Sequence, residues 1–297
     1  MITYLQLEPT NYCNLSCSFC NRKDVVGKLK HLERDELKII LEKLKGNDIK
    51  DIKFQGLGEP FLNPQYADMC KLLKDYYPKS FLITATNCQH NNLELFSKAM
   101  PYIDLCYLSV DGFQKNYEKF RNGAKWEKLV AFFEWISKAS FSRKCSINFL
   151  ATEHNSEDIP ELLKLTDKYQ LGEFRINIPQ NWNEDEMGVF GNDDRLIDAL
   201  RKHKKYVKGK ANWDFKDCFW PASGCYLDVF GNLRVCCLNT SGVDFGNIYK
   251  MDVETIKNSE RFVALQESLK SNHPGRHCIN CDYKRLAPIL AKIFIDK

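Results

Sequence analysis

The stretch Cys13-Asn14-Leu15-Ser16-Cys17-Ser18-Phe19-Cys20 decides how the rest of this sequence is interpreted. Its cysteines have the spacing C-x3-C-x2-C and follow a short apolar run, residues 2–7, that predicts a strand. The spacing fits neither the two-residue period of a strand nor the 3.6-residue period of a helix, so we expect a loop that wraps a ligand. Three thiolates are one short of a closed zinc site, whereas on a 4Fe–4S cluster they leave one iron open for a small molecule.

The composition sets broad limits. A chain of 297 residues is long enough for one large α/β domain, or for a domain of about 200 residues with a smaller one beside it. The net charge of +4 does not call for nucleic acid or membrane as a partner, and no apolar run is long enough to span a bilayer. The N-terminus lacks an export signal, so we expect a cytoplasmic, reducing location. There, thirteen cysteines favour metal ligation over disulfides.

Strand and helix patterns alternate after the cysteine loop. Strands are predicted at 2–7, 49–54, 80–85, 103–110, 145–151 and 173–178, and helices at 33–45, 66–76, 92–99, 126–138 and 159–169. Such an alternation implies a parallel sheet with right-handed crossovers. The predicted fold class is therefore α/β: a partial (β/α)6 TIM-like barrel over residues 1–180. The cysteine loop follows the first strand, at the end of the barrel where such folds place active sites.

The remaining residues depart from this alternation. Residues 181–212 are predicted to be a linker, and their basic run, 201–210, is interpreted as a solvated helix face rather than a site for phosphate or an acidic substrate. Residues 213–297 are predicted to be a small second domain with a β-hairpin around Gly231-Asn232 and a helix over 253–269. Because these elements bury little core, we expect a metal centre to hold the domain together.

The cysteines of this second domain suit a closed site with four ligands. The set consists of Cys218, Cys236, Cys278 and Cys281. Spacing alone allows either zinc or an iron–sulfur cluster. Two nearby cysteines, Cys225 and Cys237, are spare, and either could replace a ligand. The three within helix or strand patterns, Cys70, Cys106 and Cys145, are interpreted as core thiols.

Polar residues at the ends of successive predicted strands form a second constellation. Gly56-Leu57-Gly58-Glu59-Pro60 follows the second strand, where its glycines allow a backbone to lie close to a ligand and Glu59 can accept from an ammonium group. Asn87 ends the third strand, and Ser109 and Asp111 end the fourth, where they offer partners for a ribose or for an amino-acid moiety. Arg121 offers a fork for a carboxylate.

Together these motifs resemble the radical SAM superfamily, in the branch that carries a C-terminal SPASM or twitch domain. In that family three cysteines hold a 4Fe–4S cluster whose open iron is chelated by S-adenosylmethionine, and reductive cleavage of the cofactor gives a 5'-deoxyadenosyl radical. The resemblance implies this role for Cys13, Cys17 and Cys20. It also implies that Gly56, Gly58 and Glu59 hold the methionyl amino group, and that Ser109 and Arg121 contact the cofactor.

Three further contacts follow from the same resemblance. Asn148 and Ile178 would touch ribose and adenine, and the backbone of Phe19 would meet adenine. One departure is Cys88, where relatives often have glycine. The pattern from Cys218 through Gly231 to Cys236, with Gly246-Asn247-Ile248, matches the start of the SPASM pattern. The rest is shortened to one cysteine pair, which implies one auxiliary 4Fe–4S cluster.

The resemblance leaves several reactions open. We favour oxidation (dehydrogenation) of a small polar metabolite, with the auxiliary cluster as electron acceptor and a protein such as flavodoxin or ferredoxin as electron donor. The alternatives are epimerisation of a sugar or peptide residue with Cys237 or Cys225 as hydrogen donor, or formation of a C–S or C–C bond in a peptide. For Cys237 itself, a merely buried or ligating thiol is the preferred interpretation.

Two further points bear on the reaction. The chain starts directly at the first strand, which weighs modestly against a ribosomal peptide as substrate. The general base stays open among Asp104, Glu153, Asp185, Asp228 and Asp244. A non-enzymatic iron–sulfur or zinc protein is a remote alternative, because such a protein would have no use for the polar residues at successive strand ends.

Overall fold

The structure, a computed structural model, describes residues 1–179, 193–237, 244–275, 278 and 281–294. Its centre is an eight-stranded sheet in the order β6-β5-β4-β3-β2-β1-β7-β8. The strands are β1 (Tyr4–Leu7), β2 (Asp51–Phe54), β3 (Phe81–Thr86), β4 (Leu105–Ser109), β5 (Cys145–Leu150), β6 (Phe174–Asn177), β7 (Gly224–Leu227) and β8 (Leu233–Arg234). All neighbours pair in parallel except β7 and β8, which are antiparallel. The predicted α/β partial barrel is confirmed.

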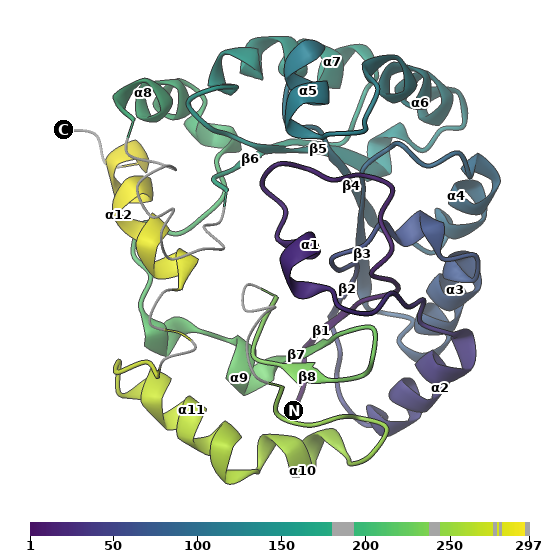
Figure 1. The fold of residues 1–297 in the computed structure, drawn as a ribbon, viewed down its shortest axis with the longest axis vertical. Coiled ribbons are helices and arrows are strands. Elements are labelled where there is room, and N and C mark those ends of the chain that lie inside the picture. Colours follow the sequence, from purple (N-terminus) through teal and green to yellow (C-terminus); the bar gives the residue numbers. More distant parts are fainter. Residues whose placement is uncertain (180–192, 238–243, 276–277, 279–280, 295–297) are drawn as a thin grey trace.

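Helices surround the sheet (Figure 1). The predicted ones are α2 (Arg34–Lys43), α3 (Tyr66–Tyr76), α4 (Leu93–Ala99), α6 (Trp126–Lys138) and α7 (Ile159–Lys168). Local chemistry sets their starts: Glu33 and Glu36 form a capping box at α2, and the Asn92 side chain accepts from the Leu95 amide at α4. Two short helices that were not predicted, α1 (Arg22–Val25) and α5 (Lys115–Phe120), follow the cysteine loop and β4.

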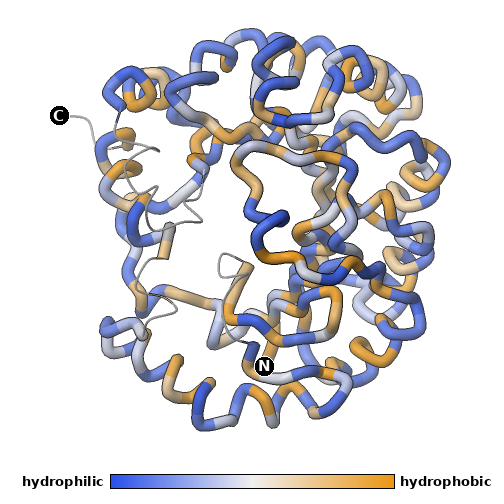
Figure 2. Tube along the Cα trace, in the orientation of Figure 1, coloured by the Kyte–Doolittle hydropathy of each residue, from blue (hydrophilic) through white to orange (hydrophobic). Residues whose placement is uncertain are grey.

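The strands place apolar and polar residues on opposite faces. In β2 and β6, Ile52, Phe54, Phe174 and Ile176 are buried, whereas the residues between them are half-buried. The peripheral helices likewise carry both hydrophobic and hydrophilic residues (Figure 2). Because side chains alternate along a strand, the helix-facing side forms the core and the other side lines the interior of the barrel.

The C-terminal segment completes the sheet rather than standing apart from it. The predicted hairpin is present, but β7 pairs with β1 in the register Leu5↔Cys225 and Leu7↔Leu227. After α9 (Trp220–Ser223) and the hairpin, α10 (Val253–Lys257) and α11 (Glu260–Lys270) continue the ring of helices (Figure 1). The single helix predicted over 253–269 is therefore wrong: Ser259 is extended and caps α11 by accepting from the Phe262 amide. The domain boundaries remain a prediction.

The predicted linker contains a helix, α8 (Asp194–Lys202), which is a correction to the sequence analysis. Asp193 caps it, and Leu196, Ile197 and Leu200 are buried. It packs against α12 (Asp282–Phe294), which was also not predicted. The basic run does not form one helix face, because α8 ends at Lys202 and a 3-10 turn follows. Within the described parts of the chain, no helix has the length and apolar character needed to cross a membrane.

Candidate functional site

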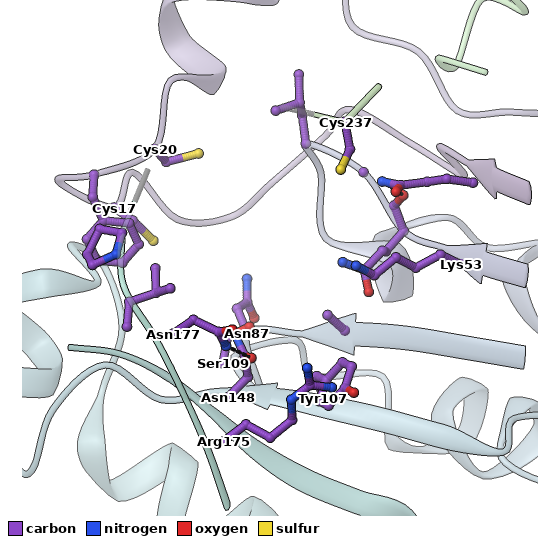
Figure 3. Close-up of a pocket in the computed structure, with 18 of the residues that line it drawn as sticks. Cys17, Cys20, Lys53, Asn87, Tyr107, Ser109, Asn148, Arg175, Asn177 and Cys237 are labelled. Atoms are coloured by element: carbon purple, nitrogen blue, oxygen red, sulfur yellow. Dashed lines mark hydrogen bonds between the residues drawn. The ribbon is translucent and has the colours of Figure 1, made fainter. Parts of the chain in front are cut away.

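A cavity of about 680 Å³ lies inside the barrel, and its wall includes residues that follow the strands. The three cysteines of the N-terminal loop, Cys13, Cys17 and Cys20, line it. So do nine of the ten residues predicted to contact the cofactor: Phe19, Gly56, Gly58, Glu59, Asn87, Ser109, Arg121, Asn148 and Ile178. Figure 3 shows Cys17 and Cys20 on one side of this cavity, with Asn87, Ser109 and Asn148 beside them. The tenth residue, Asp111, lies behind the wall.

Hydrogen bonds fasten the cysteine loop to neighbouring segments. The amides of Ser16 and Ser18 donate to the carbonyls of Asn122 and Phe120, at 3.0 and 3.1 Å. The Asn87 side chain donates to Asn14 Oδ1 at 2.8 Å, so the end of β3 also holds the loop. These contacts, between segments far apart in the sequence, fix where the thiols can point.

Two thiols of this loop, those of Cys13 and Cys17, are weakened as acids by burial. Burial raises the pKa of Cys13, and it raises the pKa of Cys17 to about 11. A thiol binds metal only after losing its proton, so a positive cluster must offset the cost of forming the buried thiolate. Among the described residues, no three His, Cys, Asp or Glu side chains are grouped closely enough to hold a metal ion. A 4Fe–4S cluster needs no such point of convergence, because each thiolate binds a different iron, and the loop thiols fit that arrangement.

Gly58 and Gly56 are required by contacts within the protein. A Cβ on Gly58 would lie 2.4 Å from the Thr10 carbonyl oxygen, and one on Gly56 would lie 2.2 Å from Glu8 Cγ. The absence of a side chain therefore lets the turn after β2 lie directly against the cysteine loop. That turn brings its next residue, Glu59, to the cavity wall.

Glu59 is a buried carboxylate with several donors. It accepts from the Asn87 amide at 2.7 Å, from Thr86 Oγ1 at 2.9 Å and from the Phe61 amide at 3.3 Å. Burial raises its pKa to about 7, although these hydrogen bonds oppose the shift. An ammonium group in the cavity would stabilise the charged form, so Glu59 fits the predicted role at the methionyl amino group.

Arg121 is held by Asp111. Its NH2 lies 2.6 Å from Asp111 Oδ2, and Asp111, which has no exposed surface, also accepts from the Leu150 amide. The Arg121 NH1 lies 4.0 Å from Cys17 Sγ, and its guanidinium lies 5.8 Å from the centre of the Phe19 ring. Its buried Nε has no hydrogen-bond partner among the described residues. The arginine is thus oriented beside the cluster thiols with donor capacity left for an anion. Asp111 acts through it rather than on a ligand.

The C-terminal cysteines gather at a second place. Cys218, Cys236, Cys278 and Cys281 all pack against one small apolar group, formed by Phe215, Val235, Leu265 and Leu269. Burial raises the pKa of Cys218 to about 11 and that of Cys278 to about 12, and neighbouring thiols in the set add to both shifts. Segments from both ends of the domain therefore bring four thiols to one small apolar group, and thiols are the ligands that an iron–sulfur cluster takes.

The two spare cysteines have different surroundings. Cys225 is buried within β7 and packs in the main core. Cys237 lines the cavity, although its neighbour Cys236 packs with the other C-terminal thiols. Figure 3 shows Cys237 facing the cavity across from Cys17 and Cys20.

Cys88, where relatives often have glycine, is buried. Its φ of 60° lies in the left-handed region that favours glycine.

Sequence reasoning missed several polar residues of the wall. They are Glu8, Lys53, Tyr107, Arg175 and Tyr226. Glu8 accepts from the Tyr226 hydroxyl at 2.7 Å and from the amides of Leu57 and Val229. The two-residue period of a strand could have indicated three of them, because Lys53, Tyr107 and Arg175 alternate with buried apolar residues in their strands.

Of the residues named as possible general bases, those that the structure describes do not border the cavity. Asp104, Glu153, Asp228 and Asp244 are absent from its wall, and Asp104 is bound by Lys74 at 2.6 Å. Asp228 lies within the hairpin, 3.0 Å from Arg234. Asp185 lies outside the described residues.

Two family descriptions match the chain. One, the radical SAM superfamily, matches residues 7–166, and the other, an iron–sulfur cluster-binding domain called SPASM, matches residues 218–282. This chain belongs to the radical SAM superfamily. Its two domains imply S-adenosylmethionine and two 4Fe–4S clusters as cofactors, which confirms the family and the cofactors predicted from the cysteine spacings. The individual cluster ligands remain predictions.

Known relatives cover most of the fold. A GTP 3',8-cyclase from Chlorobaculum tepidum is 25% identical over 177 residues, which are 57% of this chain and 52% of that protein. The chain thus spans about half the length of the curated relatives it matches. BtrN in complex with AdoMet and 2-DOIA has a TM-score of 0.59 at 16% identity, covering 92% of this chain and 89% of that one. Streptococcus suis SuiB bound to precursor peptide SuiA has a TM-score of 0.70 at 16% identity, covering 99% and 71%.

Proposed function

We propose that this radical SAM enzyme dehydrogenates a small polar substrate and passes an electron to its auxiliary cluster. The observation that carries the proposal is that one cavity is lined by the loop cysteines and also by residues that lie next to the predicted auxiliary ligands in the sequence. Cys13, Cys17 and Cys20 line one part of it, and Cys237, next to the predicted ligand Cys236, lines another. Tyr283, two residues after the predicted ligand Cys281, also lines the cavity. A substrate in this space would lie between a radical source and an electron acceptor.

The residues of the wall have distinct tasks in this proposal. When bound, S-adenosylmethionine and its cluster supply a radical that abstracts hydrogen. The loop thiols hold the cluster, Arg121 binds the methionyl carboxylate and Glu59 binds the methionyl amino group. Dehydrogenation also releases a proton, and Glu8 is the wall carboxylate we assign to accept it, because burial raises its pKa and Tyr226 fixes its Oε1.

The partners follow from the same proposal. A flavodoxin or ferredoxin would reduce the N-terminal cluster, in a cytoplasmic compartment that keeps thiols reduced. The fold itself is compatible with small substrates and with peptides, since the similar structures include BtrN bound to 2-DOIA and SuiB bound to a precursor peptide. We favour a small molecule because the wall carries many polar side chains within about 680 Å³.

The test starts from anaerobically reconstituted protein. We expect reduced wild type to convert S-adenosylmethionine to 5'-deoxyadenosine and to hold about eight irons, by iron and sulfide analysis with Mössbauer spectra. The variant with Cys13, Cys17 and Cys20 all changed to alanine should hold about four irons and no longer cleave the cofactor. Cleavage by that variant would refute the assignment of the cluster. If the wild type holds iron, and the variant holds zinc but no iron, the C-terminal cysteines do not hold an auxiliary cluster. That result would refute the electron-acceptor role of this cluster.

A second candidate function is epimerisation, favoured by the position of Cys237 on the cavity wall. A thiol there could return a hydrogen atom to a substrate radical. The test is turnover of a substrate in deuterium oxide. Epimerisation places deuterium on the product carbon, and it should stop in the variant Cys237→Ala. Dehydrogenation places none there. Cys225→Ala, at a thiol buried in β7 and away from the cavity, is the matched control.

A further inference from the structure

Three strands direct basic and aromatic side chains into the barrel. Lys53 in β2, Tyr107 in β4 and Arg175 in β6 all line the cavity. Each lies two residues before another polar wall residue: Gln55 directly after β2, Ser109 in β4 and Asn177 in β6. At about 3.3 Å per residue, they lie roughly 7 Å deeper along the strands than those residues. Figure 3 shows Arg175 beside Tyr107, with Lys53 on another side of the cavity.

The Arg175 guanidinium lies over an aromatic ring but has no anionic partner among the described residues. The carbon of its guanidinium lies 4.7 Å from the centre of the Tyr107 ring. Its Nε is buried without a hydrogen-bond partner, and it makes no ion pair within the described chain. Arg121, the other arginine of the wall, is instead neutralised by Asp111. A half-buried guanidinium without a counterion is costly, so this position indicates an anion that the protein itself does not supply.

The nearby charges do not neutralise it. Lys53 is half-buried, and its side-chain ammonium group makes no hydrogen bond or ion pair with a described residue. Among the described residues of the wall, the carboxylates are Glu8 and Glu59, and each already accepts three hydrogen bonds from groups of the protein. The charged side chains of the described wall that lack a partner in the protein, Arg175 and Lys53 among them, are therefore positive, and they attract an anion.

We propose that Arg175, stacked on Tyr107, binds an oxyanion of the substrate, and that Lys53, on another side of the cavity, adds positive charge to the same space. The substrate would be a small polar molecule with a phosphate or a carboxylate group. The planar fork of Arg175 suits either group, because both present two oxygens side by side. This inference rests on the proposed function for the statement that the anion belongs to the substrate.

The test uses the reconstituted protein, both without S-adenosylmethionine and saturated with it. Isothermal titration with inorganic phosphate and, separately, with succinate distinguishes the two groups, since a phosphate subsite binds the first and a carboxylate subsite the second. Arg175→Gln should weaken binding of the preferred anion by about tenfold or more, because a charge-assisted bidentate contact is lost. Arg175→Lys should retain part of the affinity, and Lys53→Met should weaken binding less than Arg175→Gln.

The control variant is Lys79→Gln, which removes one positive charge at an exposed residue outside the cavity wall. It should bind the anion as the wild type does. The proposal is refuted if neither anion binds, if Arg175→Gln and Lys53→Met bind as tightly as Lys79→Gln, or if saturating S-adenosylmethionine abolishes binding. The last result would assign these cations to the cofactor. Because anion binding needs no turnover, failure of the proposed reaction would be seen separately, as absent formation of 5'-deoxyadenosine.

Discussion

Asp111 and Arg121 form an ion pair that is buried beside the cluster loop, with 2.6 Å between Asp111 Oδ2 and Arg121 NH2. Asp111 lies two residues after Ser109, and Arg121 lies twelve residues after it. The ion pair explains why these two residues act as one unit. Asp111 reaches no ligand, since Arg121 and the Leu150 amide occupy it. Its task is to orient the arginine.

Asp111→Asn should therefore lower both stability and cofactor affinity. Removing one partner of a buried pair leaves an uncompensated charge, which costs about 3–5 kcal/mol of unfolding free energy. Urea unfolding and equilibrium dialysis with S-adenosylmethionine measure the two effects. The control is Asp75→Asn at the exposed Lys71–Asp75 pair, where the loss should stay below about 1 kcal/mol. Equal losses at the two sites would contradict this account of Asp111.

Glu59 predicts a pH dependence of stability. Its pKa in the folded protein is raised from 4.5 to about 7 by burial. A raised pKa means that the folded state holds a proton that the unfolded state has lost, so stability falls as the pH rises through this window. The loss is at most about 3 kcal/mol by linkage.

Without S-adenosylmethionine, the unfolding free energy of the wild type should therefore fall more between pH 5 and pH 8 than that of Glu59→Gln. Urea unfolding at both pH values measures the difference. Glu94→Gln, which removes an exposed carboxylate of α4, should keep the slope of the wild type. Parallel slopes for Glu59→Gln and the wild type would show that Glu59 is ionised in both states.

At the scale of elements, neighbouring cysteines have different environments because of the strand or turn that carries them. Cys225 lies inside β7, whose four residues are all buried between β1 and β8. Cys236 follows β8, where the chain has left the sheet and contacts the small apolar group of Phe215 and Leu265. The spacing of the cysteines in the sequence does not distinguish these thiols. The pairing of the strands does, because it buries Cys225 in the sheet and leaves Cys236 outside it.

Cys236→Ala and Cys281→Ala should thus lose about four of eight irons, because each removes a ligand of the auxiliary cluster. Cys225→Ala should keep the full iron content, and it serves as the matched control for loss of a thiol in the same segment. Iron and sulfide analysis of anaerobically reconstituted variants gives the numbers. Loss of iron in Cys225→Ala would show instead that Cys225 is a ligand of the cluster.

On the scale of the whole molecule, the ring of helices is completed by segments that are distant in sequence. Helix α8 packs against α12, and α12 supplies Leu286 and Leu290 to the cavity wall. Gly209 approaches the same helix, since a Cβ there would lie 2.5 Å from Leu290 Cδ1. The packing of α8 thus supports one side of the cavity.

Leu196→Ala should destabilise the protein by about 2–5 kcal/mol, because it leaves a cavity at a fully buried position of α8. Leu29→Ala, at a side chain that is 45% exposed, is the control for the same chemical change and should have little effect. Urea unfolding measures both. If the two variants were equally stable, α8 would contribute little to holding the cavity wall.

The sequence by itself determined what depends on local pattern. The period of apolar residues placed β1 to β6 and the main barrel helices, and the C-x3-C-x2-C loop with its glycine-rich partner indicated the radical SAM family. These signals lie within short windows of the chain. The split between α10 and α11 was missed, because the capping role of Ser259 competes with an unbroken helical pattern.

Only the tertiary structure decided which side chains meet across the barrel. The pairing of β7 with β1, the partnership of α8 and α12, and the separation of Cys236 from Cys237 all depend on contacts between residues far apart in the chain. Likewise, Lys53, Tyr107 and Arg175 read as ordinary strand residues until the closed sheet directs them into one cavity. A two-residue period says that a strand has two faces, but which face lines a cavity depends on how the sheet closes.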